Sequence, residues 1–179
     1  MSHINIEIKA RCADPDRIRN VLKSNHADYK GTDYQTDTYF NVPSGRLKLR
    51  QGNIENSLVF YSRPDQAGPK GAKVSLYHFN NGLSLKDVLT KALDVLVTVR
   101  KRREIYFIEN VKFHIDEVEN LGPFVEIEAI GAAHEISKEK LRGQCEQYTR
   151  LLAIAEEDLI DCSYSDLLMQ QEHTPPGGD

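Results

Sequence analysis

Several residue types and patterns are scarce in this sequence of 179 residues. It has no tryptophan, and its three cysteines, Cys12, Cys145 and Cys162, are widely spaced and form no C-x-x-C pair. Such cysteines predict neither a disulfide framework nor a structural zinc site, and they favour a reduced, cytoplasmic protein. Apolar runs are only a few residues long, so we expect no membrane-spanning segment and no membrane partner. The Walker A, Rossmann, H-E-x-x-H and G-x-S-x-G motifs are also absent, which leaves the usual nucleotide-binding, zinc-protease and hydrolase folds without support.

An excess of basic residues is missing as well. The chain has 23 Lys and Arg against 27 Asp and Glu, and its formal net charge is −4. Proteins that coat nucleic acid normally carry more basic than acidic residues, so we expect no nucleic-acid partner. Hydrophobic residues make up 40% and charged residues 28%, which is typical of a globular chain, and the length predicts one domain. We place that domain at residues 1–171 and a disordered tail at 172–179.

What the chain does contain is a succession of short alternating segments. In residues 3–11, Ile4, Ile6 and Ile8 share one face and Glu7 and Lys9 the other, which is the period of a β-strand. Similar patterns predict strands at 34–42, 46–50, 58–61, 73–79, 95–107, 111–118 and 124–130. Helices are expected after residue 14 and at 84–93, 137–155 and 165–171. This order predicts an α+β fold with an antiparallel, eight-stranded, barrel-like sheet and flanking helices.

The polar faces of the predicted strands are densely charged. Same-face sets recur along the chain: Glu7 with Lys9, Arg46 with Lys48 and Arg50, Lys101 with Arg103, Asp116 with His114, and Glu126 with Glu128. For any one strand, a solvent-exposed sheet face is the ordinary explanation. A solvent-exposed sheet face needs polar residues, however, and does not need repeated groups of charged ones. Charged groups on several strands therefore favour a barrel whose lumen is charged.

A charged lumen is stable only when it is wet or occupied by a highly charged guest, because clustered cations repel and unpaired buried ions are costly. Guanidinium and ammonium groups suit a polyphosphate, and the candidate phosphate-binding residues are Lys9, Arg46, Lys48, Arg50, Lys101 and Arg103. Carboxylates can hold Mg²⁺ or Mn²⁺, which commonly bridge to phosphate oxygens. The candidate metal ligands are Glu7, Asp116, Glu126 and Glu128.

Six stretches, in a fixed order over about residues 2–170, carry a resemblance to a known family. They are Asn5-Ile-Glu-Ile-Lys9, Asp37-Thr-Tyr-Phe40, Arg46-Leu-Lys-Leu-Arg50, Arg63-Pro-Asp65, Lys101-Arg-Arg-Glu-Ile-Tyr106 and His114-Ile-Asp-Glu-Val-Glu-Asn-Leu-Gly-Pro-Phe-Val-Glu-Ile-Glu128. The sequence resembles the CYTH family of triphosphate tunnel metalloenzymes, which includes class IV adenylyl cyclases, thiamine triphosphatases and inorganic triphosphatases.

The resemblance implies a triphosphate tunnel that uses Mg²⁺ or Mn²⁺. It implies catalytic roles for Glu7, Lys9, Glu126 and Glu128, and it adds Arg63 and Lys73 to the candidate substrate-binding residues. Two positions depart from the family pattern. Asn5 stands where the first Glu of a Glu-x-Glu-x-Lys motif is expected, and Ser62 stands where many members carry Lys.

Three functions remain open at this stage. The first is metal-dependent hydrolysis of the terminal phosphate of an organic or inorganic triphosphate. The second is a class IV adenylyl cyclase, which converts ATP to cyclic AMP and pyrophosphate. The third is a non-catalytic module that binds polyphosphate or nucleotide, which the exchange of Glu for Asn5 keeps open. In each case the partner is a small-molecule triphosphate, and the protein is expected to be a monomer or a homodimer.

Overall fold

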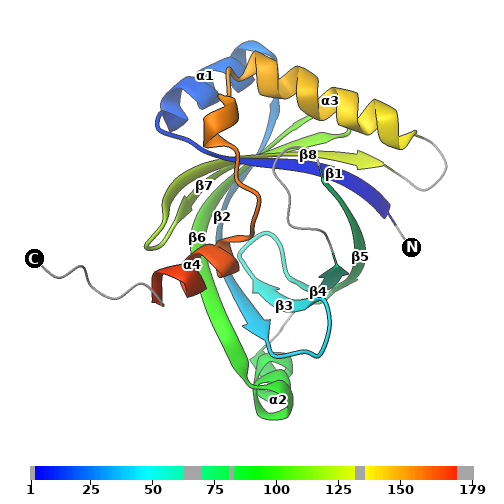
Figure 1. Ribbon diagram of the computed structural model, residues 1–179, viewed down its shortest axis with the longest axis vertical. Helices are drawn as coiled ribbons and strands as arrows, with labels where there is room; N and C mark the ends of the chain where they lie inside the picture. Colours follow the sequence, from blue (N-terminus) through cyan, green and yellow to red (C-terminus); the bar gives the residue numbers. More distant parts are fainter. Residues whose placement is uncertain (1–2, 63–69, 81–82, 132–135, 173–179) are drawn as a thin grey trace, which may run out of the picture.

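Eight antiparallel strands close into a barrel (Figure 1). The computed structural model describes residues 3–62, 70–80, 83–131 and 136–172. The strands lie in the order β1-β5-β4-β3-β2-β6-β7-β8, and β1 closes the barrel by pairing with both β5 and β8. Their bounds are β1 (His3–Arg11), β2 (Asp28–Phe40), β3 (Arg46–Gln51), β4 (Ser57–Ser62), β5 (Lys70–His78), β6 (Val95–Ile108), β7 (Val111–Val118) and β8 (Gly122–Gly131).

Within the described residues, four α-helices flank the barrel. Helices α1 (Pro15–Ser24) and α3 (Lys138–Leu151) lie over the outer face of β1 and β8, whereas α2 (Leu83–Leu93) projects from the opposite end (Figure 1). A 3₁₀ turn (Glu156–Asp158) leads to α4 (Tyr164–Glu172), which packs against β6. None of the helices within the described ranges is long and apolar enough to cross a membrane. The predicted α+β barrel with flanking helices is confirmed.

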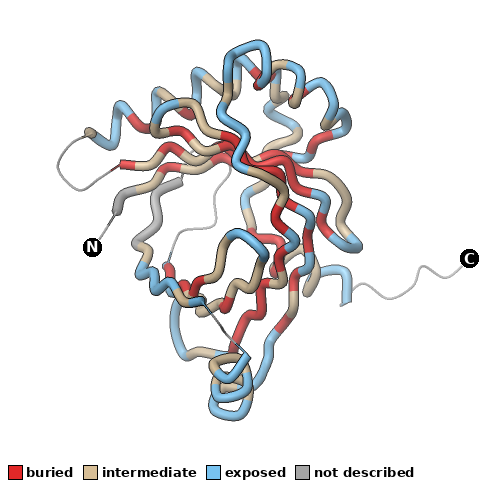
Figure 2. The backbone as a smooth tube through the Cα atoms, turned by 180° about the vertical axis from the view of Figure 1, so that it is seen from behind, coloured by how far each residue is buried: buried red, intermediate tan, exposed pale blue. Residues whose placement is uncertain are grey.

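The apolar faces of β1, β7 and β8 are directed outward, beneath α1 and α3. Ile6, Ile8 and Ala10 of β1 are buried in a cluster with Leu22 of α1 and Leu141 of α3. Figure 2 shows the buried positions gathered in the strands beneath these helices. Each fully buried aliphatic side chain contributes roughly 1.5–3 kcal/mol, so this layer supplies much of the stability. Because side chains alternate along a strand, the charged residues between these positions face the lumen.

A second core joins α4 to the other part of the barrel. Val97, Val99 and Val118 are buried in a cluster with Tyr164, and Leu167 and Leu168 of α4 pack against this cluster. A capping box forms at the start of the helix, where the backbone amide and hydroxyl of Ser163 donate to Asp166 and the Asp166 amide donates back to Ser163 Oγ. The predicted short helix at 165–171 is therefore present and docked.

Two element boundaries differ most from the sequence expectation. Strand β2 begins at Asp28 rather than at residue 34, and its register with β6 shifts between Tyr29 and Gly31, whose φ is +124°. Glycine permits that bulge, and pairing with the distant β6 extends the strand through a polar segment. Helix α3 ends at Leu151 rather than at residue 155, because Ala153 takes a φ of +48°, outside the helical region. The predicted tail at 172–179 lies almost entirely outside the described residues.

Candidate active site in the barrel lumen

A cavity of about 350 Å³ lies inside the barrel and is lined by side chains from all eight strands. Among the described residues that line it, six are basic and five are acidic: Lys9, Lys48, Arg50, Lys101, Arg103 and Lys112, and Glu7, Asp37, Glu55, Glu126 and Glu128. Most of them converge through strand alternation, because β1, β2, β3, β6, β7 and β8 turn their charged side chains inward. The predicted charged lumen is therefore present, and it contains both signs of charge in nearly equal number.

Asp37 organises the basic side of the cavity. The Arg50 guanidinium donates to both of its carboxylate oxygens, at 2.9 and 2.8 Å, and Lys101 Nζ donates to Oδ2 at 2.8 Å. Lys48 Nζ lies 3.6 Å from the same oxygen. Burial alone would raise the pKa of Asp37, but Arg50, Lys101 and Lys48 hold it well below its usual value. Asp37 thus stays ionised and allows three cations to lie close together.

The two lysines of this cluster are weakened as bases by their surroundings. Burial, with repulsion from Arg50 and Arg103, lowers the pKa of Lys101 to about 7, although Asp37 opposes the shift. Burial and Arg50 likewise lower the pKa of Lys48 to about 8. A bound anion would favour the protonated form of both groups. Their charge is therefore coupled to occupancy of the cavity.

Arg103 forms a second charged centre with two carboxylates. It donates to both oxygens of Asp116, at 2.7 and 2.5 Å, and to Glu126 Oε2 at 2.8 Å. Glu126 also lies 3.3 Å from Lys9 Nζ and 3.0 Å from His114 Nδ1. Although burial opposes it, Arg103 and Lys9 hold the pKa of Glu126 well below its usual value. Both carboxylates are ionised and fully engaged with cationic or hydrogen-bonding partners.

A third group of lumen residues has the oxygen chemistry that a divalent cation needs. Glu7 and Glu128 are directly opposite each other in the β1–β8 register, which places two like charges on adjacent strands. Asn5 Nδ2 donates to Glu128 Oε1 at 2.8 Å, while Asn5 Oδ1 is buried and has no hydrogen-bond partner among the described residues. Mg²⁺ is commonly held by one or two carboxylates, with water and substrate phosphates as the remaining ligands. Glu7, Glu128 and Asn5 fit that requirement.

The complete predicted metal set is not assembled as one cluster. Within the described ranges, no group of three or more His, Cys, Asp or Glu side chains is positioned to hold a metal ion. Asp116 and Glu126 both accept hydrogen bonds from Arg103, and these contacts compete with metal binding. The donor set that the structure offers is therefore the smaller one around Glu128.

Glu55 is a lumen residue that sequence reasoning missed. It forms ion pairs with Arg50, at 3.2 Å, and with Lys112. The buried Asp33 holds its turn in place by accepting hydrogen bonds from the backbone amides of Ile54 and Glu55, both at 2.9 Å. Glu55 follows β3 in an irregular segment, so no alternation pattern could have indicated that it enters the cavity.

The structure brings most of the predicted site residues together. Those that line the cavity are Glu7, Lys9, Lys48, Arg50, Lys101, Arg103, Glu126 and Glu128, and Asp116 contacts Arg103 directly. Arg46 is not among the lining residues, because its guanidinium lies 2.8 Å from Asp166 of α4. Arg63 and the side chain of Lys73 lie outside the described part of the chain. Asp37 belongs to a stretch that the sequence singled out, although its part in the site was not predicted.

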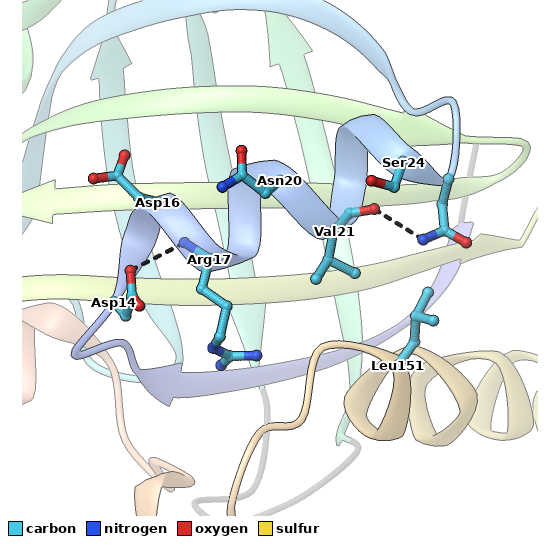
Figure 3. Close-up of a pocket in the computed structure, with 8 residues that line it drawn as sticks. Asp14, Asp16, Arg17, Asn20, Val21, Ser24 and Leu151 are labelled. Atoms are coloured by element: carbon cyan, nitrogen blue, oxygen red, sulfur yellow. Dashed lines mark hydrogen bonds between the residues drawn. The ribbon is translucent and has the colours of Figure 1, made fainter.

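A second hollow lies on the outer surface between α1 and α3 (Figure 3). Its polar groups cap α1: Asp14 accepts from the Arg17 amide at 3.0 Å, and the Asn25 side chain donates to the Val21 carbonyl at 2.8 Å. These contacts satisfy backbone groups at the two ends of the helix. The hollow is thus accounted for by helix capping, and the barrel lumen is the candidate active site.

Comparison with known proteins shows what the whole chain is similar to. The profile of the CYTH domain matches residues 3–164. A protein from Methanocaldococcus jannaschii named "Putative adenylate cyclase" is 28% identical, over 92% of this chain and 98% of its own length. The structure of the PH1012 protein from Pyrococcus horikoshii is similar with a TM-score of 0.80 at 25% identity, over 91% of this chain and 98% of that one.

A more distant likeness extends to a plant protein. A Hippeastrum protein, described as a "Putative adenylyl cyclase" with a dominant triphosphatase activity, has a TM-score of 0.65 at 16% identity, over 96% of this chain and 98% of that one. At that identity the likeness shows the fold alone. The family profile spans nearly the whole barrel and every strand that contributes to the lumen. This chain is a member of the CYTH domain family.

Proposed function

We propose that this chain is a metal-dependent enzyme that binds a triphosphate in its barrel and hydrolyses the terminal phosphate. The observation that carries the proposal is the convergence of six basic and five acidic side chains of the described residues on one cavity inside the barrel. Arginine and lysine suit phosphate oxygens, and burial strengthens their interaction with a bound anion. A solvent-exposed sheet would have no need to gather these groups around a cavity.

The near balance of charges in the lumen supports a requirement for metal. A triphosphate is strongly anionic, and the acidic residues already neutralise much of the positive charge. Glu7, Glu128 and the Asn5 carbonyl would hold Mg²⁺ or Mn²⁺, and we keep Asp116 and Glu126 as predicted ligands that would first have to leave Arg103. When bound, the metal supplies positive charge that polarises the phosphoryl group and orients the attacking water.

The protein's own residues bind and orient the phosphate chain. Three strands provide cations: Lys9 on β1, Lys48 and Arg50 on β3, and Lys101 and Arg103 on β6. In hydrolysis a water oxygen bonds to the terminal phosphorus, the bond to the bridging oxygen breaks, and the diphosphate part leaves. Negative charge spreads over the transferring group and the leaving oxygen, and fixed guanidinium and ammonium groups stabilise it without reorganising.

Adenylyl cyclase activity is the second candidate. The name of the M. jannaschii relative favours it, and the same cations would hold the phosphates of ATP while the ribose 3′-hydroxyl attacks the α-phosphorus. The products differ, so they distinguish the two reactions. The purified chain should be incubated with ATP, tripolyphosphate or thiamine triphosphate and with Mg²⁺ or Mn²⁺, and phosphate, pyrophosphate and cyclic AMP should be measured. Absence of every product would leave a non-catalytic binding module.

Glu126→Gln tests the catalytic assignment. The substitution keeps the shape of the side chain but removes the charge that contacts Arg103 and Lys9, so turnover should fall by about 100-fold or more. Glu117→Gln, at an exposed position of the neighbouring β7, is the matched control and should retain full activity. Circular dichroism would show that both variants are folded. Wild-type turnover in the Glu126 variant would overturn the assignment.

A further inference from the structure

Charge is unevenly distributed around the lumen. Strands β1, β2, β3, β6, β7 and β8 each contribute at least one ionised side chain to the cavity. As far as the structure describes β4 and β5, their lining side chains are uncharged or imidazole: Ser57, Val59, Tyr61, Val74, Leu76 and His78. We call Val59, Tyr61, Val74 and Leu76 the apolar wall.

The apolar wall is one continuous surface. In the antiparallel β4–β5 pair, Val59 is directly opposite Leu76, and Tyr61 is directly opposite Val74. Directly opposed residues have Cβ atoms about 4.5–5.5 Å apart, so their side chains touch. Lys48 is the β3 neighbour of Val59, and its Nζ lies 5.7 Å from the Tyr61 ring centroid. The wall therefore borders the cations that would hold the phosphates.

Core packing explains only part of this wall. Val59 and Tyr61 are buried in the second core, with Val74 packed against it. Leu76 lines the same cavity, belongs to neither core cluster among the described residues, and is 49% exposed. An apolar surface left open beside buried charges gains about 25 cal/mol for each Å² that a ligand covers. A phosphate chain cannot provide that contact, whereas a carbon-rich group can.

We propose that the apolar wall holds the organic part of the substrate, so that the protein selects organic triphosphates over inorganic tripolyphosphate. This inference rests on the proposed triphosphate-binding function. The cavity of about 350 Å³ is within the range of roughly 300–1,000 Å³ typical of sites for organic ligands. Phosphates would lie against β1, β3, β6 and β8, and the organic group would cross the lumen to β4 and β5.

The test compares ATP with tripolyphosphate on the full chain. Consumption of each compound gives kcat/KM whatever the products are, and isothermal titration calorimetry gives Kd. We expect ATP to be preferred by about tenfold or more, which is the usual discrimination of a small apolar contact. Leu76→Lys should reduce the preference for ATP by at least about tenfold, whereas kcat/KM and affinity for tripolyphosphate should stay the same or improve. Leu76→Ser should also reduce the preference for ATP. Tyr77→Lys, 65% exposed on the next residue of β5, is the control and should leave the ratio unchanged.

The outcomes separate this inference from the proposed function. If tripolyphosphate is turned over in preference to ATP, and Leu76→Lys and Leu76→Ser do not change the ratio of the two kcat/KM values, the proposed role of the apolar wall is wrong. The proposed triphosphatase activity would still be supported. If ATP binds more tightly than tripolyphosphate but neither compound is turned over, the result would support the role of the apolar wall in binding and overturn the proposed enzymatic function. Failure of both compounds to bind would overturn both.

Discussion

The hydroxyl of Tyr164 donates a hydrogen bond of 2.8 Å to Oδ2 of Asp116, which ties the first residue of α4 to the middle of β7. The Tyr164 ring also lies 4.0 Å from Lys9 Nζ, measured to the ring centroid. Asp116 in turn holds Arg103. One side chain from the C-terminal helix therefore contacts two members of the charged centre around Arg103 and Glu126.

Tyr164→Phe should lower the free energy of unfolding by about 1.5–3 kcal/mol, because a buried hydrogen bond to a charged carboxylate is lost while the ring is kept. Urea denaturation followed by circular dichroism measures the change. Tyr34→Phe, at a residue that is 67% exposed, is the control and should have little effect. Equal stability of the Tyr164 variant and the wild type would mean that the hydroxyl does not stabilise α4 on the barrel.

Asp37→Asn should be more damaging, because Arg50, Lys101 and Lys48 would face one another without their shared counter-ion. Removing one member of a buried ionic cluster costs about 3–5 kcal/mol. Tripolyphosphate should then raise the melting temperature of the variant more than that of the wild type, since it replaces the missing charge.

Differential scanning fluorimetry with and without tripolyphosphate tests this effect. Asp87→Asn breaks an exposed ion pair with Lys91 and should change neither the melting temperature nor the response to the anion appreciably. An identical response of the Asp37 variant and the wild type would show that the anion does not reach this cluster.

Affinity for a polyanion should fall as the pH rises from about 7 to about 9. The pKa of Lys101 is lowered to about 7 and that of Lys48 to about 8, chiefly by burial, so each cation is present below its pKa and lost above it. In a Lys48→Arg variant, affinity should fall less at pH values above the pKa of Lys48, because arginine stays protonated. Calorimetric Kd values for tripolyphosphate across this pH range provide the measurement. Superimposable profiles for the variant and the wild type would exclude Lys48 as the titrating group.

Gly52→Ala should disturb the turn that places Glu55 in the lumen. An added Cβ would clash with Asp33 Oδ1, so the carboxylate or the turn must shift, with an expected cost of about 1–3 kcal/mol. Gly143→Ala in α3 is the control, because an added Cβ there would meet no described atom within 4 Å outside the adjacent residues and the helix's own backbone, and alanine favours helix by about 0.5–1 kcal/mol. Thermal unfolding of both variants should show opposite shifts, and a stabilised Gly52 variant would contradict the prediction.

Much of the site was predictable because it depends on a local pattern. Alternation along β1 fixes Glu7 and Lys9 on the face opposite Ile6 and Ile8, whatever the partner strands are. The same rule identifies Lys101 and Arg103, which line the cavity, and separates them from Arg100 and Arg102, which are exposed. Phase within a strand is a short-range property, so one sequence suffices to determine it.

Other features depend on which elements meet. Arg46 alternates in phase with Lys48 and Arg50, yet it pairs with Asp166 of α4, a helix that packs against β6. Glu55 enters the lumen only because Asp33, more than twenty positions earlier, binds its turn. Contacts of this kind have no periodic signal in the sequence.

The sequence by itself determined which face of each strand is charged and, with that, the chemistry of the lumen. The tertiary structure decided that β1 pairs with both β5 and β8 and so closes the barrel, which carboxylate neutralises which cation, and that β4 and β5 give the cavity one apolar side. The physical reason is range. Side-chain alternation is set by the geometry of neighbouring peptide units, whereas strand pairing and ion pairing are set by distant residues that only the folded chain brings together.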